Sequence, residues 1–160
     1  MFRVWMALAA VGLIGIDQLT KWWAVTTLTD NPIVLIPEVF ELHLTYNTGA
    51  AFSMLEGETW LLTLLPALVS VAVLVVLFWG KWRQYKLINV GGLLLAAGGI
   101  GNLIDRVVAG QVTDFLYFKL IDFPIFNFAD CCVVIGAALV LIFLLFYYEE
   151  KPKSTVGDPQ

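Results

Sequence analysis

Four long apolar runs constrain the fold of this chain more than any other feature of its sequence. A membrane-spanning helix needs about 20 mostly apolar residues to cross a hydrocarbon core about 30 Å thick, and each run has about that length. The expected spans are residues 4–25, 59–80, 87–108 and 128–148. With 60% hydrophobic and 14% charged residues, the composition also differs from that of ordinary soluble domains. We therefore expect an all-α polytopic membrane protein with four transmembrane helices.

The lysines and arginines predict the orientation of these spans, because cytoplasmic loops are enriched in both. Arg3 precedes the first span, the short loop 81–86 is basic, and further lysines follow the last span. Loops 26–58 and 109–127 contain no lysine or arginine other than Lys119. Both termini are therefore expected in the cytoplasm, and the two long loops are expected outside.

The first outer loop predicts a small β element. In residues 40–47, Phe, Leu, Leu and Tyr alternate with polar residues, and this period of two is typical of a strand with one apolar face. That face could rest on lipid or on the helix ends. Residues 1–150 are expected to form a single membrane-embedded domain, and residues 151–160 a disordered tail.

The polar residues of the spans gather in one leaflet. They are Asp17, Gln18 and Lys21 in the first span, Asn102, Asp105 and Arg106 in the third, and Asp130 at the start of the fourth. A charge at the centre of a span costs about 2.5–3.5 kcal/mol, and less near the interface. Transporters and channels need polar groups through both leaflets. The pattern therefore favours a site that acts at the outer surface.

Helical spacing places these polar residues on shared faces. The groups are Asp17 with Lys21, and Asn102 with Asp105 and Arg106. Gly98 lies one turn before Asn102, where a missing side chain lets another backbone approach. An alternative is that these residues only hold helices together. Asp105 in particular could point toward water at the end of its helix.

Elimination leaves the chemistry of carboxylates. His43 is the one histidine, so HExxH zinc chemistry and a Ser-His-Asp triad lack parts, and His43 is expected on the surface of the strand. No local pattern supports a dyad of Ser53 and Lys21. The adjacent Cys131 and Cys132 start an apolar run and are expected to be small buried residues without a disulfide. Neither a metal nor a cofactor is expected.

Two aspartates remain as candidates for acid–base chemistry. Asp114 follows the third span and Asp130 begins the fourth, so both are expected at the same membrane surface. Two close carboxylates cannot both ionise easily, so one keeps a proton and can polarise a carbonyl while the other takes a proton from water. The spacing does not show that they meet, and Asp130 could instead be a helix N-cap.

Five motifs in this order resemble those of lipoprotein signal peptidases, the signal peptidase II family. They are "DQLTKWW", "YNTGAAFS", "GGIGNLIDR", "GQVTDF" and "FNFAD", and the resemblance runs from residue 17 to residue 134. It implies a four-helix membrane bundle with a small extracytoplasmic sheet. It also implies an aspartic endopeptidase of the bacterial cytoplasmic membrane that has its active site near the outer surface.

The resemblance also implies roles for individual residues. The catalytic pair is Asp114 and Asp130. The supporting positions are Asp17, Lys21, Asn47, Asn102, Arg106, Asn127 and Ala129. Arg106 could bind substrate carbonyls or steady the charge of the pair. The loop around Asn47 is expected to fold over the substrate as a lid, and Phe115, Phe126 and Phe128 could pack against acyl chains.

The implied partners are membrane lipid and a prolipoprotein that carries diacylglycerol on its cysteine and is cut just before it. The cyclic peptide globomycin is the implied inhibitor, and the net charge of -4 gives no reason to expect nucleic acid. The alternative is a non-enzymatic membrane protein that binds or chaperones lipoproteins. In that case neutralising Asp114 or Asp130 would leave its function intact.

Overall fold

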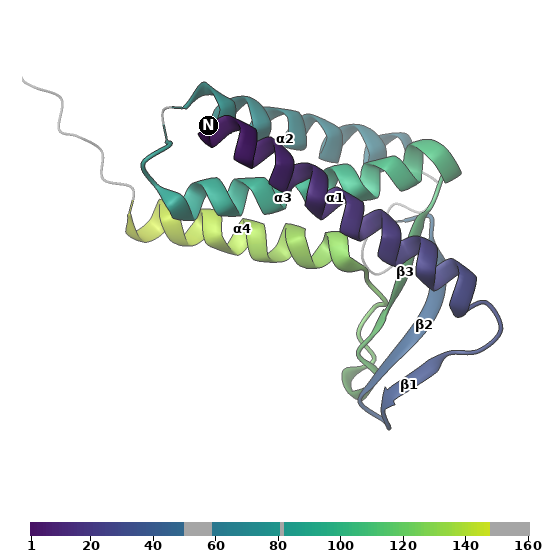
Figure 1. The fold of residues 1–160 in the computed structure, drawn as a ribbon. Helices are drawn as coiled ribbons and strands as arrows, with labels where there is room; N and C mark the ends of the chain where they lie inside the picture. Colours follow the sequence, from purple (N-terminus) through teal and green to yellow (C-terminus); the bar gives the residue numbers. More distant parts are fainter. Residues whose placement is uncertain (50–58, 81, 148–160) are drawn as a thin grey trace, which may run out of the picture.

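The structure is a computed structural model that describes residues 1–49, 59–80 and 82–147. Within these ranges the chain forms four long helices that lie side by side as a bundle (Figure 1). They are α1 (Phe2–Thr27), α2 (Thr59–Trp79), α3 (Lys86–Ala109) and α4 (Phe128–Phe146). Each coincides closely with one of the four expected spans. The expected tail, residues 151–160, lies outside the described residues.

Three of the helices, α1, α3 and α4, are long and apolar enough to cross a membrane. The part of α2 from Thr63 to Trp79 is apolar as well. Helix α3 is central, since it packs against each of the other three helices. The described part of the chain is therefore a mostly helical membrane protein, as expected.

Small residues bring α3 and α4 into close contact. A Cβ atom on Gly136 would lie 2.5 Å from the backbone nitrogen of Leu95 and 2.6 Å from the carbonyl oxygen of Gly91. Further along the same interface, a Cβ on Gly98 would collide with the carbonyl oxygen of Ala129. Such close approach is how helices pack in lipid, where no hydrophobic effect drives them together. The start of α4 is thereby held against α3.

A three-stranded antiparallel sheet stands at one end of the bundle (Figure 1). Its strands are β1 (Ile33–Ile36), β2 (Phe40–Asn47) and β3 (Val112–Tyr117), in the order β1-β2-β3. The strand expected at residues 40–47 is thus confirmed. Leu42 and Leu44 pack against Leu28 at the end of α1. The apolar face therefore rests on a helix end.

The expected alternation along β2 is only partly correct. Glu41 is buried, and Tyr46 is 48% exposed. Tyr46 follows an irregularity in the pairing with β3 between Leu42 and Thr45, which interrupts the period of two. The buried Glu41 lies before this irregularity and accepts a hydrogen bond from Lys119 at 2.9 Å. A distant lysine therefore accounts for a buried polar residue at this position.

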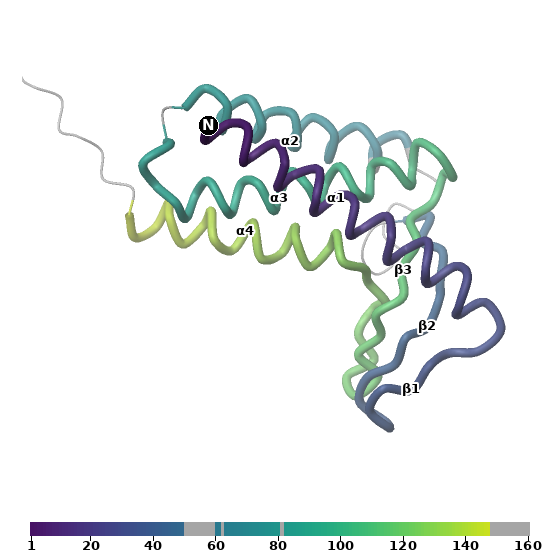
Figure 2. Tube along the Cα trace, viewed as in Figure 1, coloured from purple at the N-terminus to yellow at the C-terminus, as the bar shows by residue number. Residues whose placement is uncertain are grey.

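Strand β3 connects α3 to α4, and this connection positions the candidate site. Helix α3 ends at Gly110, whose left-handed backbone (φ 72°) turns the chain into β3. Figure 2 follows the chain from α3 through β3 and then through residues 118–127 into α4. The chain therefore brings Asp114 on β3 back beside the first turn of α4.

Candidate active site

The first turn of α4 is fixed by a reciprocal capping arrangement. The Asn127 side chain accepts a hydrogen bond from the Asp130 backbone nitrogen at 2.9 Å, and the Asp130 carboxylate accepts one from the Asn127 backbone nitrogen at 3.0 Å. Such a capping box satisfies backbone donors that a helix start leaves free. Asn127 is thus the N-cap, whereas Asp130 occupies the third helical position. Asp130 therefore has a structural partner and still presents its other oxygen to the site.

Asn127 also joins the two candidate aspartates. Its side-chain nitrogen donates to Asp114 Oδ1 at 2.6 Å, while its backbone nitrogen holds Asp130. Asn47, at the end of β2, donates to Asp114 Oδ2 at 3.1 Å. A helix N-cap and two strands therefore bring together carboxyl groups that lie sixteen residues apart in the sequence.

Asn102 on α3 completes the contacts of Asp130. Its side-chain nitrogen donates to Asp130 Oδ1 at 2.7 Å. Its side-chain oxygen accepts from Lys21 Nζ at 2.8 Å and from Asn127 Nδ2 at 3.0 Å. A single amide thus connects α1, α3 and α4 at the site.

The ammonium group of Lys21 lies at the junction of α1 and α3. Asp17 and Asp105 hold it at 3.0 Å and 3.1 Å. Asp17 in turn accepts a hydrogen bond from the backbone nitrogen of Ala129 at 3.0 Å. The charged pair on α1 therefore fastens α1 to the start of α4 as well as to α3.

Asp105 does not point toward water, so that expectation is wrong. Its side chain is 9% exposed and accepts hydrogen bonds from Gln18 at 3.0 Å and from the Thr113 backbone nitrogen at 3.0 Å. The reason is tertiary, because β3 folds back over the end of α3 and covers it. The i,i+3 spacing of Asp105 from Asn102, which puts both on one helix face, was the available sequence signal for an inward-facing residue.

Burial and the second carboxylate make Asp114 a weaker acid. Asp114 is 1% exposed. This burial, together with the charge of Asp130, raises the pKa of Asp114 to about 6, although hydrogen bonds from Asn47 and Asn127 oppose the change. Asp114 therefore holds a proton far more readily than a solvent-exposed aspartate.

Both carboxyl groups line a groove of about 990 Å³. Polar groups form its floor, and its apolar wall comes from the segment before α4 and from α4 itself. The lining residues that matter here are Asn47, Asn102, Arg106, Asp114, Asp130, Phe123, Phe126, Val134 and Ile135. Arg106 donates to the carbonyl oxygen of Gly49 at 3.2 Å at the edge of the groove. Phe126 lines the groove, whereas Phe115 is buried against the end of α1.

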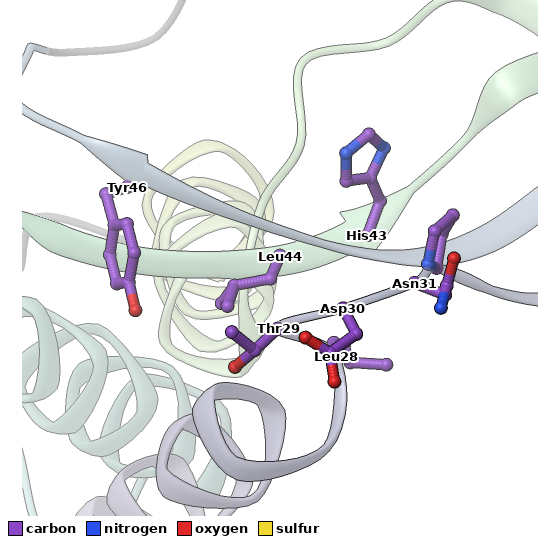
Figure 3. A pocket seen from close by; sticks show the side chains of 8 residues that line it. Leu28, Thr29, Asp30, Asn31, His43, Leu44 and Tyr46 are labelled. Atoms are coloured by element: carbon purple, nitrogen blue, oxygen red, sulfur yellow. The ribbon is translucent and has the colours of Figure 1, made fainter.

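A second pocket, of about 280 Å³, lies between β2 and the segment that follows α1 (Figure 3). Asp30, Asn31 and His43 surround it, and Tyr46 lines both this pocket and the groove. His43 is exposed, as expected. Across the described residues, no group of three His, Cys, Asp or Glu side chains could hold a metal ion.

The expected lid falls partly outside the described residues. The expected lid begins at Asn47, which is described, but residues 50–58 of the same loop are not. Ser53 lies in that segment, while Lys21 is buried and paired with acids. Both cysteines are free thiols. Cys132 is buried as expected, whereas the expectation is wrong for Cys131, which is only half-buried because it lines the groove.

Membrane-length helices with buried carboxyl and amide groups beside an apolar groove define a membrane protein with a buried polar site. Residues 9–146 match the family model described as signal peptidase (SPase) II. The chain belongs to the signal peptidase II family, and it is therefore a peptidase of lipoprotein processing.

Individual relatives agree with this assignment. A lipoprotein signal peptidase of Gloeobacter violaceus is 43% identical over 84% of this chain and 78% of its own. One from Deinococcus radiodurans is 41% identical over 86% of this chain and 78% of its own. A solved structure described as a bacterial membrane enzyme superposes with a TM-score of 0.80 at 33% identity, covering 91% of this chain and 94% of that one.

Proposed function

We propose that this peptidase is an aspartic endopeptidase that removes the signal peptide from diacylglyceryl-modified prolipoproteins, cutting just before the lipidated cysteine. The observation that carries the aspartic mechanism is the placement of Asp114 and Asp130 around Asn127 at the wall of the groove. Two carboxyl groups in one buried network can share one proton, which is the requirement of this chemistry.

The reaction needs one carboxylate and one carboxylic acid. The carboxylate takes a proton from water as the water oxygen attacks the scissile carbonyl carbon. The acid donates its proton to the carbonyl oxygen, so that charge does not build up in a medium of low dielectric. Arg106, whose guanidinium lies at the groove, is proposed to bind a substrate carbonyl near the scissile bond.

The proposed topology has four transmembrane helices in one domain, residues 1–150, with both termini in the cytoplasm. Helix α2 has 21 residues, so at about 1.5 Å per residue it is about 31 Å long, enough to cross a bilayer. The positions of Arg3, Arg83 and Lys86 at the end of the bundle opposite the sheet support this orientation. The site then lies near the outer surface of the bacterial cytoplasmic membrane.

The apolar wall of the groove supports a lipidated substrate. Val134 and Ile135 are 67% and 53% exposed on α4 and continue the groove along the helix surface. In a bilayer they would contact acyl chains, either of membrane lipid or of the diacylglyceryl group on the substrate. The same polar floor and apolar wall are proposed to bind globomycin.

The test is cleavage of a diacylglyceryl-modified prolipoprotein by the purified protein in detergent, with a metal chelator present. Wild type is compared with Asp114→Asn, Asp130→Asn and the control Asp122→Asn. Asp122 is an exposed carboxylate that accepts a hydrogen bond from Tyr117 and lies outside the groove lining. We expect cutting before the cysteine by wild type and the control, and none by the other two.

Cutting that survives substitution of Asp114 or Asp130 would overturn the aspartic mechanism. Binding of the substrate by a folded wild type without any cutting would favour the alternative, a protein that binds or chaperones lipoproteins. The membrane-inserted groove alone suits that alternative, but the shared buried network of two carboxyl groups has no purpose in it.

A further inference from the structure

The two carboxyl groups have unequal surroundings. Asp114 is 1% exposed on a strand, and both its oxygens accept hydrogen bonds from the neutral amides of Asn47 and Asn127. Asp130 is less buried and lies in the first turn of α4, where the helix dipole favours a negative charge. Burial favours the neutral acid, whereas a helix start favours the anion.

A relay of two hydrogen bonds runs from Lys21 to Asp130 through one amide. Lys21 Nζ donates to Asn102 Oδ1 at 2.8 Å, and Asn102 Nδ2 donates to Asp130 Oδ1 at 2.7 Å. A hydrogen bond accepted by one end of an amide strengthens the bond that the other end donates. Since Lys21 is 3% exposed, solvent does little to screen its charge.

The interposed amide has a consequence for catalysis. A direct ion pair with Lys21 would occupy Asp130 and leave it unable to receive a proton from water. Through Asn102 the charge stabilises the anion, yet the outer part of the carboxylate remains open to the groove. Asp17 and Asp105 hold the ammonium in place at 3.0 Å and 3.1 Å, and their own negative charges partly offset it.

Other charged groups also lie around Asp130. Arg106 on α3 lines the groove together with both carboxyl groups, so its positive charge acts on both. Asp114 from β3 and Cys131 on the same helix are ionisable neighbours of Asp130, and Asp17 and Asp105 contact Lys21. The relay from Lys21 through Asn102 is therefore what distinguishes Asp130 from Asp114.

We infer that Asp130 is the ionised member of the pair and Asp114 the protonated one, and that Lys21 is the positioning residue that fixes this choice through Asn102. This inference rests on the proposed aspartic mechanism. Asp105, which lies in the motif "GGIGNLIDR" but was not among the expected supporting positions, belongs to the same arrangement as a counter-charge.

The inference assigns every proton in the reaction. As the water oxygen bonds to the scissile carbon, the water proton moves to Asp130 and the Asp114 proton moves to the carbonyl oxygen. When the carbon–nitrogen bond breaks, Asp130 gives its proton to the leaving nitrogen, and one hydroxyl of the intermediate returns a proton to Asp114. Both groups are then restored. The raised pKa of Asp114, about 6, is consistent with its place as the acid.

The test uses charge changes of opposite sign and the pH dependence of kcat/KM. Lys21→Met removes a positive charge, so ionisation of the base, Asp130, becomes harder. The acidic limb of the pH profile of kcat/KM should therefore move to higher pH by about one unit. Asp105→Asn removes a negative charge, so the same limb should move down by several tenths of a unit. Lys21→Arg keeps the charge and should restore most of the wild-type profile.

A purely structural role for these residues predicts something else. In that case the variants would lose rate, or would shift the limb in the same direction, and the inference would be wrong. If Lys21→Met does not fold, the test rests on Asp105→Asn alone. The acidic limb of its pH profile must still move to lower pH for the inference to hold. Lys119→Met is the matched control, since Lys119 pairs with Glu41 at the sheet and lies outside the groove lining. Both limbs of the pH profile of Lys119→Met should stay in place.

The proposed function and the inference about Lys21 can fail separately. If wild type cuts and Asp130→Asn does not, the aspartic mechanism holds whatever the limbs do. If the acidic limb of the kcat/KM profile then stays fixed in both Lys21→Met and Asp105→Asn, only the inference about Lys21 is overturned.

Discussion

The two ends of the α3–α4 interface are built from different chemistry. At the end away from the sheet, Gly91 and Gly136 let the helix backbones touch, and the rings of Tyr85 and Phe143 pack with centroids 4.9 Å apart. At the end beside the sheet, Asn102 and Asp130 meet through a hydrogen bond of 2.7 Å. One helix pair therefore carries a close-packed end and a polar end.

This difference teaches where a membrane peptidase can place its polar groups. Close packing of small residues holds helices together without any buried polar group. Buried carboxyl groups are costly within a bilayer, and they are tolerated where a helix starts and a sheet folds over it. The packed end provides stability, so that the polar end can keep an arrangement suited to chemistry.

The largest expected effect is on the rate, at the polar end. Asp130→Asn should lower kcat/KM by at least about 10³-fold, because an amide cannot take a proton from water. The measurement is cleavage of the lipidated substrate at saturating and subsaturating concentrations. A loss in KM alone, with kcat retained, would mean that Asp130 binds substrate and does not react.

The next effect is on stability, at the packed end. Gly136→Leu should destabilise the fold by about 3 kcal/mol or more, because its Cβ would already lie 2.5 Å from the Leu95 backbone nitrogen. The measurement is the thermal unfolding midpoint in detergent. Ala137→Leu is the control, since Ala137 is exposed on the same helix and should change the midpoint little.

A third prediction concerns the pH dependence of stability. Because folding raises the pKa of Asp114 from 3.8 to about 6, the folded state holds this proton more tightly than the unfolded state. The resulting stabilisation is complete below pH 3.8 and is lost as the pH rises through about 6. Asp114→Asn lacks this stabilisation at every pH. The free energy of unfolding of the variant minus that of wild type should therefore rise by up to about 3 kcal/mol as the pH is raised from 4 to 7.

Unfolding of both proteins across this pH range gives the answer. An Asp114→Asn variant whose stability relative to wild type is the same at pH 4 and pH 7 would contradict the raised pKa. The sign of the change does not depend on any hydrogen bond that the new amide loses, because such a loss is the same at both pH values.

The smallest expected effect lies at the sheet, away from both ends of the interface. Lys119 contacts Glu41 at 2.9 Å and Glu38 at 3.4 Å, and the side chains of these acids are 10% and 84% exposed. Glu41→Gln should therefore lower the unfolding midpoint by a few degrees, whereas Glu38→Gln should leave it nearly unchanged. Equal effects of the two substitutions would show that burial does not set the strength of this pair.

The sequence by itself determined the helices and one strand. Apolar runs near the length of a bilayer crossing predicted all four helices to within a few residues, because that length is a direct physical requirement. The alternation in residues 40–47 predicted β2. Helical spacing was also sufficient for the pair of Asp17 and Lys21, since residues four apart on a helix are neighbours.

Only the tertiary structure decided which polar groups meet. No local spacing could show that Asn127 would bridge Asp114 and Asp130, that Glu41 would be buried and paired with Lys119, or that β3 would cover Asp105. These contacts join segments from different elements, and their partners are set by how helices and sheet pack. Periodicity reports the face of a residue on its own element, whereas the group that it meets there depends on the path of the whole chain.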